Sequence, residues 1–278
     1  MPLFIHSDCS VTTSSLYPRG RLVATSLIWF LIQSAVAQGN NSDQRLLDAV
    51  GTIYCEGKIR GSAVHISLPE KSPQDHSVIL SAAHIFFDQE TGQAYNSCQY
   101  RPQNKRLGGV NVQAVSRSQY AVSATDKITQ AENDSIFLLL QRRLYQPSLV
   151  LSAKGATASS QLTLVAYSAD LDRITVSEPC RPQISPQRVS KYLLLHNCRA
   201  QGGMSGGPIV DTANGKIVAI HGGALVFNQQ PLNGGLRESR LTLKRHQVEP
   251  SAWINQGRII DHQLMIDLKT FISKNSNH

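Results

Sequence analysis

From residue 50 onward the chain is built of short apolar runs separated by Gly, Pro, Asn, Asp and Lys. Runs of this length suit β-strands and are too short for most helices. Asn214-Gly215, between two of the runs, is a typical two-residue hairpin turn. Short strands with turn residues between them predict an all-β sandwich or barrel. The predicted strands are residues 50–56, 61–68, 77–82, 109–115, 121–124, 135–140, 161–167, 174–177, 192–197, 208–211, 216–221 and 241–243.

The end of the chain follows a different period. Leu264, Leu268, Phe271 and Ile272 fall on one face of a helix, and the lysines of this stretch fall elsewhere. We therefore expect a C-terminal helix at about residues 262–274.

The first 37 residues have the pattern of an export signal. Arg19 and Arg21 precede an apolar run from Leu22 to Ala37, which ends in an Ala-Val-Ala cleavage pattern. Residues 1–37 are thus predicted to be a signal peptide, with cleavage before Gln38. The alternative is an uncleaved membrane anchor, although the run is short and polar for a transmembrane helix.

The chain carries 27 Lys and Arg against 19 Asp and Glu, a formal net charge of +8. A basic balance raises the question of nucleic-acid binding. However, the basic residues are scattered, with only short clusters such as Arg142-Arg143, and no basic stripe with interleaved aromatic residues occurs. We interpret the charge as a solvated basic surface and expect no nucleic-acid partner.

The cysteines agree with export to an oxidising compartment. Loss of residues 1–37 would remove Cys9 and leave an even set, Cys55, Cys98, Cys180 and Cys198, which allows three disulfide pairings. The sequence contains no H-E-x-x-H and no C-x-x-C, so we expect neither a metal nor a cofactor.

The segment from Gly202 to Pro208 is the sharpest motif. Five of its seven residues are Gly or Pro, and Ser205 stands in the middle. Glycines allow a tight turn in which two backbone N–H groups point at one position, which is what an oxyanion hole requires. Alternatively, this is a glycine-rich loop with an incidental serine.

Two further segments each present one polar side chain beside an apolar strand. His84 follows residues 78–83, where two alanines leave room for a neighbouring element, so its ring could serve as a general base. Asp134 opens the strongly apolar run 136–140, and a carboxylate in such a place needs a hydrogen-bonding partner such as a histidine N–H. Taken singly, His84 could be a core residue and Asp134 a turn residue.

Together and in this order, the three segments resemble the trypsin/chymotrypsin-like serine peptidases. Ser81-Ala82-Ala83-His84 resembles that family's histidine motif, Asp134 to Leu139 its aspartate strand, and Gly203 to Pro208 its G-x-S-G-G-P serine motif. The resemblance spans about residues 50–274. It implies two six-stranded antiparallel β-barrels, at about 50–145 and 155–260, within a peptidase domain of residues 38–274.

The resemblance also implies roles for single residues. Ser205 would be the nucleophile, His84 the general base and Asp134 the residue that orients the histidine, with the N–H groups of Gly203 and Ser205 forming the oxyanion hole. Met204 departs from the trypsins, which have an aspartate there that pairs with a new N-terminus. In this respect the chain is more similar to the bacterial branch. The disulfides implied are Cys55–Cys98 and Cys180–Cys198, one in each barrel.

Specificity is the least constrained feature. Arg199 stands where trypsins have an aspartate, so a preference for Lys or Arg is not supported. His221, followed by two glycines, resembles the pocket histidine of bacterial glutamyl endopeptidases. Arg199 and His221 would then favour substrates with an acidic side chain.

The function expected from the resemblance is that of a secreted or periplasmic serine endopeptidase. Its partners would be protein or peptide substrates and, as a further class, a protein inhibitor, with no membrane contact after signal cleavage. Two alternatives stay open. One is a non-catalytic binding protein on the same fold. The other is a serine esterase, because Gly203 to Gly207 also match G-x-S-x-G.

Overall fold

The computed structural model describes residues 43–68, 76–183, 189–226 and 253–275. The predicted signal peptide and the predicted strand at residues 241–243 lie outside these ranges. A helix over residues 43–49 leads into the first strand. No helix in the described ranges is long and apolar enough to cross a membrane.

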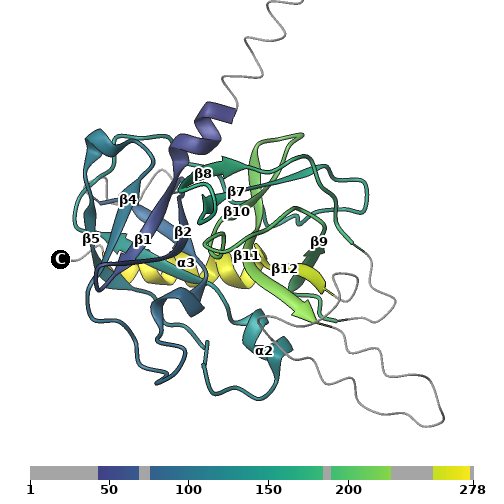
Figure 1. Cartoon of the computed structure of the whole chain (residues 1–278), viewed down its shortest axis with the longest axis horizontal. Coiled ribbons are helices and arrows are strands. Elements are labelled where there is room, and N and C mark those ends of the chain that lie inside the picture. Colours follow the sequence, from purple (N-terminus) through teal and green to yellow (C-terminus); the bar gives the residue numbers. More distant parts are fainter. Residues whose placement is uncertain (1–42, 69–75, 184–188, 227–252, 276–278) are drawn as a thin grey trace, which may run out of the picture. The chain divides into compact units, whose positions relative to one another are not determined.

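Six antiparallel strands close into a barrel in the order β1-β2-β3-β6-β5-β4. Figure 1 labels β1, β2, β4 and β5 of this barrel. Its strands bury large aliphatic and aromatic side chains such as Ile53, Leu80, Tyr100, Phe137 and Leu138, none of them more than 1% exposed. The strands are β1 Val50–Cys55, β2 Lys58–His65, β3 Val78–Ser81, β4 Cys98–Pro102, β5 Val110–Val115 and β6 Ile136–Leu140.

The second sheet also has six strands, in the order β8-β7-β10-β11-β12-β9, but it does not close. Its strands are β7 Leu162–Ser168, β8 Arg173–Val176, β9 Leu193–His196, β10 Pro208–Asp211, β11 Lys216–Val226 and β12 Trp253–Ile259. The hairpin turn predicted at Asn214-Gly215 joins β10 to β11, with Gly215 at φ +67°.

The expectation of two closed barrels is therefore corrected: one barrel is closed and the second sheet is open. Where the closing strand would lie, two isolated bridges occur instead, Leu162↔Cys180 and Pro182↔His196. Pro179 and Pro182 flank this stretch, and proline has no N–H to donate to a continuous ladder. The chain thus touches both edges of the gap without forming a strand across it.

Two helices complete the described fold. α2 (Lys127–Glu132) begins at Asp126, whose side chain accepts a hydrogen bond from Ile128 N, and it contributes Ala131 to a small cluster with Leu193, Leu195 and Leu225 of the second sheet. α3 (His262–Asn275), yellow in Figure 1, is the predicted C-terminal helix. It buries Leu264, Leu268 and Phe271 in the main core.

Three local expectations differ from the structure. Residues 121–124 form a turn rather than a strand, because the Gln130 amide donates to the carbonyl groups of Ala121 and Val122 and replaces a strand partner. Strands β4 and β12 were not predicted. Their sequences, CQYRP and WINQGRI, mix polar and apolar residues and pack mainly through partners distant in sequence.

Candidate active site

His84 lies directly after β3, in the short 3₁₀ helix η1 (Ala83–Phe86). The alanines before it, Ala82 and Ala83, are completely buried. The His84 side chain itself keeps 23% of its surface exposed. The rigid end of a buried strand thus holds a ring that is still accessible to solvent.

Asp134 lies between α2 and β6 and is only 3% exposed. It contacts His84 at two points. Its Oδ1 accepts a hydrogen bond from the His84 backbone N–H at 2.8 Å, and its Oδ2 lies 2.7 Å from His84 Nδ1. A carboxylate only accepts hydrogen bonds, so Nδ1 carries the proton. In the neutral ring, Nε2 is then left as an acceptor, which is the tautomer a general base needs.

The loop that carries Ser205 is held by hydrogen bonds from both sheets. Ser62 N–H of β2 donates to the Ser205 carbonyl at 2.7 Å, and the Ser62 hydroxyl donates to the Gly203 carbonyl at 3.0 Å. From β11, the His221 carbonyl accepts from Gly206 N–H at 2.8 Å. Gly203 and Gly206 have φ of +87° and +84°, a region that side chains disfavour.

Gly206 brings the serine loop against the histidine strand. A Cβ at Gly206 would lie 2.1 Å from the Ser62 carbonyl oxygen and 2.2 Å from Ser81 Oγ, so only glycine fits. Ser81 is three residues before His84, and Gly206 is next to Ser205. The three predicted site residues are therefore drawn together by the contact between these segments, although no hydrogen bond joins Ser205 Oγ to the His84 ring in the described structure.

Three backbone donors of the loop are free. In the described part of the chain, the N–H groups of Gly202, Gly203 and Ser205 have no hydrogen-bond acceptor. Most backbone donors of a fold are paired, so free donors on either side of Met204 are available for an incoming oxygen. Met204 itself is 6% exposed and packs in the core of the second sheet.

The two residues expected to set specificity lie in different surroundings. Arg199 is exposed, whereas His221 is 3% exposed, with its Nδ1 3.3 Å from Nε2 of His196. Burial, followed by the charges of His196 and His84, lowers the pKa of His221 to about 3. His221 is therefore neutral at pH 7, and the role expected of Arg199 and His221 in specificity stays a prediction.

Both predicted disulfides are present. Cys55–Cys98 joins paired positions of β1 and β4 in the closed barrel, and Cys180–Cys198 links the segment after β8 to the residues after β9. Cys198 is fully buried and stands seven residues before Ser205. The second disulfide thus braces the strand that leads to the serine loop.

Two residues of the site carry no signal in the sequence. Ser62 lies in β2, and its contact with Gly203 spans 141 residues. Tyr120 lies in a loop, with its ring centroid 6.3 Å from that of His84. Burial and the charge of Asp134 raise the pKa of Tyr120 to about 12. Neither could be found from the chain alone, because a single serine or tyrosine outside a motif marks no site.

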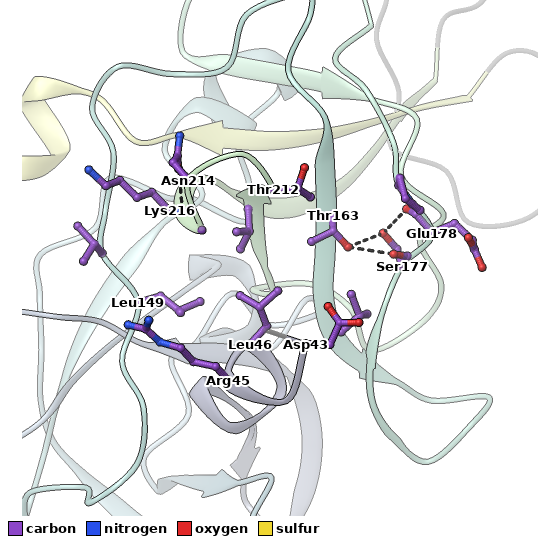
Figure 2. A pocket seen from close by; sticks show the side chains of 15 residues that line it. Asp43, Arg45, Leu46, Leu149, Thr163, Ser177, Glu178, Thr212, Asn214 and Lys216 are labelled. Atoms are coloured by element: carbon purple, nitrogen blue, oxygen red, sulfur yellow. Dashed lines mark hydrogen bonds between the residues drawn. The ribbon is translucent and has the colours of Figure 1, made fainter. Parts of the chain in front are cut away.

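A cavity of about 570 Å³ lies apart from these residues (Figure 2). It is lined by the helix at residues 43–49, by β7 and β8, and by the turn of the β10–β11 hairpin, including Leu46, Thr163, Asn214 and Lys216. β10 starts beside the Ser205 loop and runs away from it, so the cavity lies at the far end of the hairpin. None of the predicted site residues lines it. Among the described residues, no group of three or more His, Cys, Asp or Glu could hold a metal ion.

The serine esterase alternative conflicts with this architecture. That class needs a serine on a turn between a strand and a helix, within alternating strands and helices. Ser205 instead precedes β10, and the described elements are mainly antiparallel strands.

Comparison with known proteins points the same way. Residues 68–220 match the family described as trypsin-like peptidase domain. No match was found among curated proteins. Solved structures that share the fold include the following three proteins. A Glu endopeptidase is 12% identical, with a TM-score of 0.54, over 82% of this chain and 91% of that chain. The protease Anisep from Arthrobacter nicotinovorans is 15% identical, with a TM-score of 0.56, over 83% and 98%. The thermostable serine protease AL20 from an extremophilic microorganism is 12% identical, with a TM-score of 0.56, over 82% and 98%.

Proposed function

Because this chain belongs to the trypsin-like peptidase family, we propose that it is a secreted serine endopeptidase with Ser205, His84 and Asp134 as its catalytic residues. Its substrates would be proteins or peptides. The observation that carries the proposal is the paired hydrogen bond between Asp134 and His84, because it fixes the ring with Nδ1 protonated and Nε2 available.

The reaction would begin when His84 Nε2 takes the proton of Ser205 as Oγ attacks the scissile carbonyl carbon. The negative oxygen that forms would accept hydrogen bonds from Gly203 N–H and Ser205 N–H. In comparable sites, one such donor is worth about 3 kcal/mol in the transition state. His84 would then pass its proton to the leaving amine. Water, activated by the same ring, would hydrolyse the acyl-enzyme and regenerate Ser205.

The arrangement would not need activation by a new N-terminus. Trypsins use an aspartate before the nucleophile to bind that amine, and here the position is occupied by the buried Met204. The loop is instead supported by Ser62 and by the His221 carbonyl, as described above.

The experiment is labelling of the purified protein with a fluorophosphonate probe, followed by peptide mapping. Wild type should be labelled at Ser205 only, and Ser205→Ala should lose both the label and peptide hydrolysis. Ser67→Ala is the matched control: Ser67 lies two residues after the end of β2 and bonds the Ser148 hydroxyl, so its loss should leave both signals intact. A folded wild-type protein that takes up no label would favour the non-catalytic alternative.

Preference for Glu or Asp before the scissile bond stays a prediction. A neutral His221 could still donate an N–H to a substrate carboxylate, and the approach of that negative charge would raise the histidine pKa. Arg199, which is exposed, would have to swing toward the substrate. A peptide-library profile of wild type, Arg199→Ser and His221→Ala decides whether either residue contributes. Unchanged profiles in both variants would remove them from the specificity pocket.

A further inference from the structure

Gly222 stands where β11 bends toward Asp134. The register between β11 and β12 shifts between His221 and Gly223, so Gly222 is the extra residue of a β-bulge. A Cβ on Gly222 would lie 3.0 Å from Asp134 Oδ2 and 2.5 Å from Gln256 Nε2. One point in space is therefore close to the catalytic carboxylate and to the amide nitrogen of Gln256, and only the missing side chain keeps it open.

Gln256 is a buried polar residue of β12, 2% exposed. Its Oε1 has no hydrogen-bond partner among the described residues. A buried acceptor without a partner costs free energy, so a hydrophobic residue of the same size would serve stability better. The amide orientation has a clear electrostatic reason, because the carbonyl end would be repelled by the Asp134 carboxylate and the N–H end is attracted to it.

We propose that Gln256 is a positioning residue for Asp134: its side-chain N–H lies near Oδ2 across the space left by Gly222 and, as a nearby dipole, helps to keep the carboxylate turned toward His84. No hydrogen bond joins Nε2 to Oδ2 in the described structure, so the attraction acts over a longer distance than a direct bond. This inference rests on the proposed function, since it assigns Gln256 to the same catalytic group. Gln256 acts through Asp134 and does not touch the reacting atoms.

The carboxylate has room for this donor. Oδ1 accepts from His84 N–H and Oδ2 from His84 Nδ1–H, and each carboxylate oxygen can accept a second hydrogen bond. A further donor draws charge away from Oδ2, which weakens the hold of Asp134 on a protonated His84 ring. Removing the donor should therefore move the acid limb of the kcat/KM profile to higher pH.

Other titrating groups do not obscure this limb. Tyr120 and His221 both interact electrostatically with Asp134. The pKa of Tyr120 is raised to about 12 by burial, and that of His221 is lowered to about 3 by burial. Neither changes charge between about pH 5 and pH 9.

The test is the pH profile of peptide hydrolysis by variants of the full chain. Gln256→Met, which keeps the volume and removes the donor, should lower kcat about ten- to a hundredfold with little change in KM. Its acid limb should move up by about one pH unit. Gln256→Glu places a second carboxylate beside Asp134 and should move the limb further in the same direction.

A conservative variant separates positioning from folding. Gln256→Asn keeps a side-chain N–H donor at this position, whereas Gln256→Ala removes it. Gln256→Asn should therefore retain more of the kcat and of the wild-type acid limb than Gln256→Ala does. Gln146→Met is the matched control, because Gln146 also has an unpartnered buried Oε1 but bonds Tyr100 in the first barrel. It should leave the pH profile unchanged.

The outcomes are distinct. A wild type that neither labels nor hydrolyses peptides refutes the proposed function and this inference with it. An active wild type whose Gln256→Met and Gln256→Glu variants keep its acid limb refutes the inference alone, even if their melting temperatures fall. A Gln256→Asn variant with the same kcat and acid limb as a folded, impaired Gln256→Ala variant also counts against it, since a positioning role depends on the amide donor.

Discussion

His196 and His221 form a buried pair of imidazoles beneath the serine loop. Their rings are 5.3 Å apart in an edge-to-face arrangement. Burial lowers the pKa of His196 to about 4, and burial with the charge of His196 lowers that of His221 to about 3. Both are therefore neutral where the ordinary histidine, with a pKa near 6.5, would begin to take up protons.

This difference predicts acid sensitivity. Between about pH 6.5 and pH 4 the unfolded chain binds protons at these two positions and the folded protein does not. The free energy of unfolding therefore rises with pH across this window and falls on acidification, on the order of 2 kcal/mol for one such group. We expect His196→Gln to show a shallower fall of melting temperature from pH 7 to pH 4 than wild type.

The exposed His262 provides the comparison for this measurement. His262→Gln should follow the wild-type slope, because an exposed ring gains nothing from burial. Equal slopes for all three proteins would show that the buried pair does not control acid stability.

The catalytic residues should behave as a unit. We expect Ser205→Ala, His84→Ala and Asp134→Asn each to lower kcat by roughly 10⁴-fold or more without unfolding the protein. Because they act in one proton-transfer chain, Ser205→Ala/His84→Ala should cost little more than either change alone. Steady-state kinetics with a peptide substrate measure this, and losses that multiply would contradict a shared mechanism.

At the scale of elements, β2 is the strand that joins the closed barrel to the serine loop. Ser62 is fully buried, donates its hydroxyl to the Gly203 carbonyl and accepts a hydrogen bond from Tyr167 N–H of β7. One hydroxyl thus contacts the loop and the second sheet together. The precision of the Ser205 position depends on it, because the loop has few other supports from the first barrel.

Removal of this hydroxyl should loosen the loop. Ser62→Ala leaves a buried carbonyl and a buried N–H without their partner, so we expect a loss of about 1–3 kcal/mol in unfolding free energy and a lower kcat. Urea unfolding and peptide kinetics measure the two effects. Ser67→Ala, which removes the part-buried hydrogen bond between the Ser67 and Ser148 hydroxyls, should lower the unfolding free energy much less. Equal losses in the two variants would show that the Ser62 hydroxyl is no more important to the fold than an ordinary part-buried one.

The elements also show what the sequence can reveal. The strands around His84 and Asp134 are continuous apolar runs, and the serine loop has a run of glycines, so local pattern was sufficient to predict them. β4 and β12 are defined instead by their neighbours, as in the pairing of Cys55 with Cys98. Ser62 and Gln256 belong to the site only through contacts across the fold, which no local pattern encodes.

At the scale of the molecule, the main hydrophobic core contains residues from both sheets. It contains Leu138 of the barrel, Ile217 of the second sheet and Leu268 of α3 in one cluster. Each is at most 1% exposed. The two sheets should therefore unfold together, since neither can keep this cluster buried without the other.

Export should determine where the mature chain begins. The pattern at residues 19–37 predicts cleavage before Gln38, close to the start of the helix at residues 43–49. We expect N-terminal sequencing of the exported protein to give Gln38 or a residue near it. An exported chain that still begins at Met1 would instead indicate the uncleaved anchor.

The open second sheet affects how readily its backbone amide protons exchange with solvent. In the closed barrel every strand is covered by a neighbour on both sides, so its amide protons are reached by solvent only through wider unfolding. β8 pairs with β7 on one side alone among the described strands, and β9 is met at its outer edge only by the bridge at Pro182. Amide protons should therefore exchange for deuterium first in the edge strands β8 and β9 and last in the strands of the closed barrel. The sheet that carries the serine loop is then the part of the fold that opens more readily.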